Sequence, residues 1–206
     1  MKKKFFAIVV IYLAIIVLLY FRLFGNKEDN MGNSDNNTNK TEEFVLTNTM
    51  KAKVENYCYF IDEFKSEKDF DKEFIENFIS NQYLYFGNKN EVTEVTFADG
   101  TTHSMGVTNK EEIDSLFELV FGRKMPEVDL NKTDTFSAVF CENDKYYIET
   151  REAGDFFYQY DSGSIKNKQG IINVLKVEEE TQTKIEVTVE KSSNINGFII
   201  KKVSIK

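Results

Sequence analysis

The most regular hydrophobic pattern in the chain is an unbroken apolar run near its N-terminal end. Residues 5–21 are all apolar or aromatic, Arg22 interrupts the run, and Leu23 and Phe24 extend it. A helix over residues 5–24 would be about 30 Å long, which matches the hydrocarbon core of a bilayer. No face of this helix is polar, which argues against a surface helix of a soluble domain. The pattern therefore predicts a transmembrane helix.

The flanks of the apolar run favour an uncleaved signal anchor. A cleaved signal peptide needs a shorter apolar region and small residues at its cleavage site, whereas this run ends in Tyr20, Phe21 and Arg22. A lipoprotein needs a cysteine directly after the run, but the first cysteine is Cys58. Three lysines at positions 2–4 precede the run, so the positive-inside rule places the N-terminus in the cytoplasm and the rest of the chain outside. Cleavage is the alternative.

A polar segment separates the predicted anchor from the rest of the chain. Residues 25–41 are rich in Asn, Asp, Ser and Gly, and Met31 is their only large apolar residue. Such a composition cannot form a packed core, so we expect a flexible linker. The remaining residues, 42–206, then form one outer domain, which agrees with the usual size of a domain.

Beyond the apolar run, apolar residues recur at steps of three and four over residues 42–65 and 69–82, which predicts two amphipathic helices. A third helix is expected after Thr108, because Thr108 and Glu111 match a capping box and Gly122 provides a C-terminal stop. Alternating or β-rich segments predict strands over residues 91–97, 101–107, 135–141, 145–150, 156–160, 171–178, 184–190 and 198–205. Asp99-Gly100 indicates a type I′ hairpin turn.

Helices followed by an antiparallel meander indicate an α+β domain with helices packed on one face of a curved antiparallel sheet. The order resembles the cystatin-like, or nuclear-transport-factor-like, cone, in which early helices cover a long bent sheet. The resemblance spans residues 42–206 and rests on element order, on residues 107–122 (VTNKEEIDSLFELVFG) and on the aromatic-rich hairpins that follow. It implies the extracytoplasmic domain of a small membrane-anchored protein of a Gram-positive bacterium. It implies no activity, because cone-fold domains include enzymes, ligand binders and assembly subunits.

The net charge of the chain indicates which classes of partner the outer domain can bind. Four of the 26 basic residues and none of the 34 acidic ones lie in residues 1–24, so the remainder carries 22 basic against 34 acidic residues, a net charge of −12. Nucleic acids are bound mainly through lysine and arginine, so a nucleic-acid partner is not expected. A basic or apolar partner is favoured, although the charge also serves solubility alone.

Reactive residues are few. With one histidine and two cysteines, neither a disulfide scaffold nor a histidine-rich metal site is expected, and no cofactor is predicted. His103 lies in a predicted strand, where the adjacent Ser104 points to the opposite face, so the two do not form a catalytic pair. Cys58 and Cys141 either form a disulfide outside the membrane or remain two buried thiols, and the sequence leaves both open.

Several acidic residues lie in predicted turns, where we expect them to be solvated and to have no specific chemical role. They are Glu142, Asp144, Glu152, Asp155, Asp161, Glu178, Glu179 and Glu180. The oxygen-rich stretch at residues 161–164 does not match the spacing of an EF-hand loop. No metal site is therefore predicted from these carboxylates.

Aromatic residues of the second half provide the only candidate contact site. They are Tyr146, Tyr147, Phe156, Phe157, Tyr158 and Tyr160. They would either line the mouth of a pocket or simply pack within the sheet, since aromatic residues favour strands.

The sequence as a whole predicts a non-enzymatic, single-pass protein of the cell membrane whose acidic outer domain binds a membrane-protein partner or a small ligand. The layout of short cytoplasmic tail, one span and cone-fold outer domain is shared by assembly subunits of bacterial transport and secretion machines. The alternative is a small hydrolase or isomerase that uses the pocket of the cone. An enzyme would bring ionisable groups together in an apolar pocket.

Overall fold

A computed structural model describes residues 44–166 and 169–206, all of which belong to one unit spanning Glu42–Lys206. The predicted anchor, residues 5–24, and the predicted linker, residues 25–41, lie outside the described residues. Within the described ranges, no helix is both long enough and apolar enough to cross a bilayer.

Among the described residues, the three predicted helical segments give three α-helices, and a short 3₁₀ helix lies between the first two. Helix α2 spans Asn48–Tyr57, the 3₁₀ helix η1 spans Glu67–Asp69, α3 spans Lys72–Phe86 and α4 spans Lys110–Phe121. Each α-helix begins at a side chain that accepts a backbone N–H, which satisfies one of the free donors of the first turn. For α4 this N-cap is Asn109, so the predicted capping box at Thr108 is wrong. The predicted stop at Gly122 is confirmed, because its φ of 71° is left-handed.

The first predicted helix is much shorter than expected. The pattern predicts a helix over residues 42–65, but α2 ends at Tyr57. Beyond it, Phe60, Ile61 and Phe64 are still buried, and Phe64 forms an isolated antiparallel bridge with Val203. The apolar spacing in this stretch therefore reflects burial of these side chains against the second sheet, and it does not indicate that the helix continues.

The strands of the described part of the chain form two separate antiparallel sheets of four strands each. The first has the order β1-β2-β4-β3, and the second has the order β5-β6-β7-β8. Their bounds are β1 Val92–Thr96, β2 Thr102–Asn109, β3 Val139–Glu142, β4 Lys145–Glu149, β5 Phe157–Lys166, β6 Gln169–Glu178, β7 Thr181–Lys191 and β8 Phe198–Ile205. The predicted α+β class is thus confirmed, but the single curved sheet is wrong.

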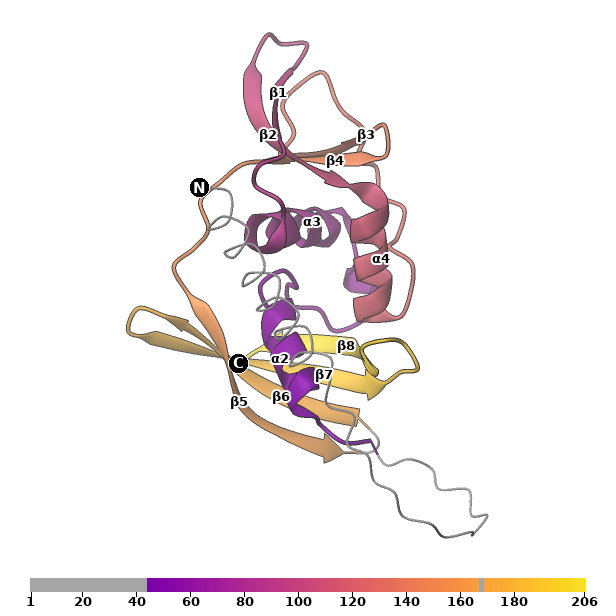
Figure 1. The fold of residues 1–206 in the computed structure, drawn as a ribbon, viewed down its shortest axis with the longest axis vertical. Helices are drawn as coiled ribbons and strands as arrows, with labels where there is room; N and C mark the ends of the chain where they lie inside the picture. Colours follow the sequence, from indigo (N-terminus) through magenta and orange to yellow (C-terminus); the bar gives the residue numbers. More distant parts are fainter. Residues whose placement is uncertain (1–43, 167–168) are drawn as a thin grey trace, which may run out of the picture. The chain divides into compact units, whose positions relative to one another are not determined.

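The helices lie in a layer between the two sheets (Figure 1). Helix α3 packs on β3 and β4 of the first sheet, α2 packs on β5 and β6 of the second, and α4 contacts both β2 and β8. The buried side chains of α3 spread around much of its circumference, from Phe74 to Leu84. A helix with so wide an apolar surface needs cover on two sides, which two sheets provide.

Turn chemistry differs between the hairpins. Asn143 and Asp144 both have positive φ, of 52° and 58°, and join β3 to β4 as a two-residue turn of the type I′ pattern. At the predicted Asp99-Gly100 turn only Gly100 has positive φ. There the Asp99 carboxylate accepts the N–H of Thr101 at 2.9 Å, and the loop between β1 and β2 is longer than two residues. The predicted type I′ turn is therefore wrong.

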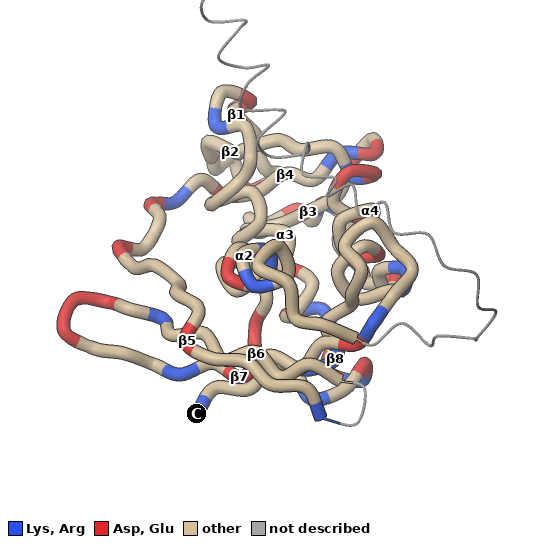
Figure 2. The backbone as a smooth tube through the Cα atoms, turned by 60° about the horizontal axis from the view of Figure 1, so that its bottom comes forward, with Lys and Arg blue, Asp and Glu red and all other residues tan. Residues whose placement is uncertain are grey.

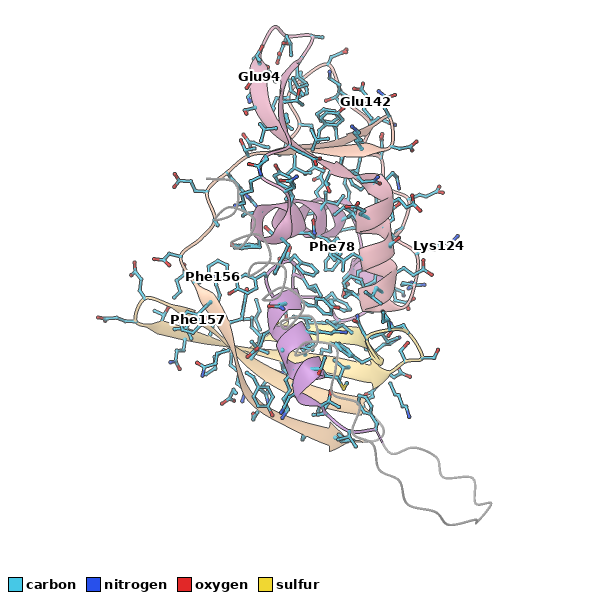
Figure 3. All side chains as sticks on the ribbon, viewed as in Figure 1. Phe78, Glu94, Lys124, Glu142, Phe156 and Phe157 are labelled. Carbon is cyan, nitrogen blue, oxygen red and sulfur yellow. The ribbon has the colours of Figure 1, made fainter. Side chains whose placement is uncertain are left out.

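The core between the sheets is rich in aromatic residues. Phe78, Phe117 and Phe198 have no more than a trace of exposed surface, and Figure 3 shows Phe78 within the helix layer. The Phe70 ring, directly after η1, and rings of α3 and α4 meet with centroid separations of 4.5–6.0 Å in edge-on and tilted arrangements. Such pairs contribute beyond the area that they bury. A smaller cluster of Val95, Phe97, Met105 and Phe140 covers part of the first sheet.

Candidate functional site

The six aromatic residues that the sequence singles out do not form one site. Tyr146 and Tyr147 lie in β4 of the first sheet, whereas Phe157, Tyr158 and Tyr160 lie in β5 of the second. Phe156 directly precedes β5. Because neighbouring residues of a strand face opposite sides, each group is divided again between two faces.

The two tyrosines of β4 have separate structural roles. The Tyr147 ring stacks on Phe140, with centroids 4.7 Å apart and planes 3° apart. The buried Tyr146 hydroxyl donates to Asp114 Oδ1 at 2.9 Å and so ties the sheet to α4. Burial, with the hydrogen bond to this carboxylate, raises the Tyr146 pKa far above its usual range.

Two of the β5 residues also lie away from a cavity. Phe157 is 52% exposed on the face opposite Tyr158. Tyr160 packs near α2, where the Lys51 ammonium lies 4.7 Å from the centre of its ring. The backbone N–H of Tyr160 donates to the Glu55 carboxylate, which further ties α2 to this edge strand.

Phe156 and Tyr158 join two residues that the sequence reasoning missed. Tyr59 follows α2 and Tyr85 lies in the last turn of α3. The Tyr59 centroid is 5.0 Å from Tyr85, 5.9 Å from Phe156 and 4.8 Å from Tyr158. We call the cavity of about 370 Å³ that these four rings line the aromatic groove. Three separate segments of the chain thus converge at one site.

The remaining walls of the aromatic groove are half apolar and half polar. Its base is the end of the second sheet, where Ile185 and Ile205 are paired across β7 and β8. Two carboxylates, Asp62 and Glu63, line it from the segment after α2. The volume lies near the lower end of the range for pockets that hold small molecules or single side chains.

A lysine already lies on one ring of the groove. The Lys176 ammonium is 4.2 Å from the centre of the Phe156 ring, close enough for a cation–π interaction. It also forms an ion pair with Glu178 at 2.9 Å, near the acidic tip of the β6–β7 hairpin seen in Figure 2. The Phe156 ring, which lines the cavity, therefore already accepts a positive charge.

Two groups at the groove, the Tyr158 phenol and the Cys58 thiol, hold their protons at neutral pH. Burial raises the pKa of Tyr158 well above its usual value, and nearby Cys58, Tyr85, Tyr59 and Asp62 add to the shift. Burial likewise raises the pKa of Cys58 to about 12, with a smaller contribution from the charge of Glu55. At neutral pH neither the phenol nor the thiol is ionised, so neither is an activated nucleophile or a ready base.

The disulfide that the sequence allows is not formed. Cys58 and Cys141 are both free thiols, and they line different cavities. Cys58 is buried beside the aromatic groove, whereas Cys141 in β3 is partly exposed beside α4. We therefore expect two thiols per chain in the unfolded protein without reductant.

Thiol labelling provides a direct check of this arrangement. In the native protein at pH 8, we expect Cys141 to react with iodoacetamide at least about tenfold faster than Cys58. Burial raises the pKa of both thiols, but Cys58 is buried with a pKa of about 12, whereas Cys141 is partly exposed. The Cys58 rate should continue to rise as the pH approaches 12. Mass spectrometry of labelled peptides measures both rates, with Cys141→Ser as the control. Equal rates, or no free thiol after unfolding, would contradict the structure.

A second group of polar residues lies beside α4. Lys110 forms an ion pair with Asp114 one turn later, and Asp114 also accepts the Tyr146 hydroxyl, as described above. These three residues line a cavity of about 330 Å³ with Cys141 and Met125. The Asp114 carboxylate thus accepts from both Lys110 and Tyr146, and through Tyr146 it connects α4 to β4.

The other candidates for chemistry lie apart from both cavities. The His103 ring stacks on Phe136 at 4.0 Å, on the first sheet. Glu152 and Asp155 are exposed in the segment before β5. Glu142 ends β3 and Asp144 lies in the β3–β4 turn, while the Glu178–Glu180 run lies at the β6–β7 turn. Among residues 44–166 and 169–206, no three His, Cys, Asp or Glu side chains are grouped to hold a metal ion.

Only part of the site had a signal in the sequence. The stretch at residues 83–86, two tyrosines and a phenylalanine around Leu84, is too short to assign by itself and becomes the last turn of α3. Tyr59 lies within the predicted helix over residues 42–65, so nothing in the pattern set it apart, whereas the observed helix α2 ends before it at Tyr57. Comparison of the chain with protein-family models, curated proteins and solved structures found no match in any of the three.

Proposed function

We propose that residues 44–206 form a binding domain and that the aromatic groove is its binding site. The observation that carries the proposal is the convergence of Tyr59, Tyr85, Phe156 and Tyr158, from three segments, around one cavity. Partly exposed aromatic rings at a cavity are typical of contact sites, because they supply large apolar area at low entropic cost. In this proposal the domain is held outside the cell membrane by residues 5–24.

Binding suits the chemistry of the groove better than catalysis. Its phenol and thiol groups hold their protons at neutral pH, and its lysine is paired with Glu178. A general base or nucleophile would need a pKa nearer the working pH. The proposal keeps the relation to cystatin-like domains only in its general form, helices packed on an antiparallel meander.

A hydrolase or isomerase is the second candidate, and one observation favours it. Lys110, Asp114 and Tyr146 meet at the cavity beside α4, where Tyr146 is a protonated donor. In that case Tyr146→Phe would abolish activity while Phe156→Ala would not. The binding proposal expects the opposite dependence.

Co-purification of the full-length chain from membranes tests the binding proposal. We expect the protein in the membrane fraction, and a stoichiometric partner or ligand with it after solubilisation. Phe156→Ala should lose that component because the ring borders the groove. Phe157→Ala is the matched control, since it removes the same ring from the next residue on the opposite face. A component retained equally by both variants, or none with the native chain, would overturn the proposal.

A further inference from the structure

We propose that the aromatic groove binds the ammonium group of a lysine side chain presented by a protein partner. This inference rests on the proposed function and specifies the chemistry of the bound group. It starts from the groove's own geometry, in which a lysine of this chain already shows how such a group lies on a ring.

The Lys176 side chain marks the position of a cation. Its ammonium lies 4.2 Å from the centre of the Phe156 ring, and 29% of its side chain remains exposed. The carboxylate of Glu178, 51% exposed, holds it at 2.9 Å. A partly exposed lysine that is held by one exposed carboxylate is displaced at little cost, because ion pairs open to solvent contribute little in water. The ring face can therefore exchange one ammonium group for another.

Two carboxylates of the groove are available to an incoming charge. Asp62 and Glu63 line the cavity, and neither forms an ion pair with any described residue. Lys176 is the only basic residue among the cavity's described lining residues, and Glu178 already meets its charge. The local balance is therefore negative, as is the chain's net charge of −8. Charge complementarity selects a cationic group over an anionic or neutral one.

The apolar walls fit the rest of a lysine side chain. Ile185 and Ile205 lie at the end of the sheet that forms the base, and the methylenes of a lysine pack on such a surface while its charged end stays near rings and carboxylates. A cavity of about 370 Å³ holds one side chain of this length without enclosing a whole peptide. The partner then contributes one anchoring lysine from a surface segment.

Peptide titration of the full-length protein, in a maltoside detergent, tests the charge requirement. The probe is a pentapeptide with one central lysine between glycines, and its matched control has norleucine at that position. Tyrosine ring resonances measured by NMR report binding. We expect the lysine peptide to bind at least about fivefold more tightly than the norleucine peptide. Its affinity should fall as salt is raised from low to physiological concentration.

Two pairs of variants test whether binding depends on the groove itself. One pair compares the two phenylalanine rings, and the other compares two lysine charges. Phe156→Ala should weaken the lysine peptide about three- to tenfold, whereas Phe157→Ala should leave it unchanged. Lys176→Met should tighten it about threefold, because the resident ammonium no longer has to be displaced. Lys184→Met is the control, since it removes the same charge from the next strand on the other face, where Lys184 pairs with Asp161 at 3.6 Å.

Equal binding of the lysine and norleucine peptides would overturn the inference, as would equal effects of Lys176→Met and Lys184→Met. Binding of choline without binding of the lysine peptide would also overturn it, because it would assign the groove to a small ammonium ligand. The proposed function fails separately. If co-purification depends on Phe156 while the lysine peptide does not bind, the groove is a binding site of other chemistry.

Discussion

Replacement of Gly106 by alanine should destabilise the domain by about 3 kcal/mol or more. A Cβ atom at this position would lie 2.1 Å from Tyr83 Cζ and 2.3 Å from the Tyr83 hydroxyl oxygen. The ring cannot easily retreat, because Tyr83 is 4% exposed and packs within the core. The backbone cannot retreat either, since Gly106 is paired with Val92 on one side and with Ile148 on the other.

Urea unfolding followed by circular dichroism measures this effect, with two comparisons. Gly100→Ala adds the same methyl group where nothing lies within 4 Å, so its cost should be about 1–2 kcal/mol, from the φ of +85° alone. In a Tyr83→Ala background, the cost of Gly106→Ala should fall sharply, because the clash has been removed. A Gly106→Ala cost below that of Gly100→Ala would show that the ring does not occupy this space.

Truncation of Phe117 to alanine is the second large expected effect, about 3–5 kcal/mol. Phe117 on α4 has no exposed surface, and its ring contacts those of Phe70, Phe78 and Phe121 with centroids 4.5–5.4 Å apart. Removing it leaves a cavity between Phe70, α3 and α4 that neighbouring aromatic rings fill poorly, because they are already packed against one another.

The matched comparison for Phe117→Ala is Phe157→Ala. Its ring is 52% exposed on β5, so we expect a cost below about 1 kcal/mol in the same urea titration. Phe117→Leu should fall between the two, since most of the volume is kept. Equal costs for the buried and the exposed phenylalanine would contradict the placement of α4 in the helix layer.

Local signals in the sequence identify several elements directly. The alternation over residues 198–205 marks β8 with the bounds that the structure shows, and Gly122 ends α4 in the left-handed conformation that glycine adopts most readily. Asn143 and Asp144 close the β3–β4 hairpin, because both residue types tolerate positive φ. These features depend on a few neighbouring residues, so the chain's own order is enough to predict them.

For the candidate site, the sequence identified two of the four aromatic residues that line the groove but not the other two. Phe156 and Tyr158 were singled out together with Tyr146, Tyr147, Phe157 and Tyr160, yet only the first two reach the aromatic groove. Strand alternation explains the separation of Phe157 from Tyr158 once the register is known. Tyr59 and Tyr85 had no distinguishing local pattern, because their place at the site depends on how α3 and the segment after α2 meet the second sheet.

The sequence by itself therefore determined the α+β class, the positions of most helices and strands, and the acidic charge, since periodicity and composition are local properties. Only the tertiary structure decided that the strands divide into two sheets around a helix layer, and that α2 stops at Tyr57. A repeating apolar pattern records that a face is buried but not what buries it. Strand pairing and the convergence of four rings join residues far apart in the chain, and no local pattern specifies those partners.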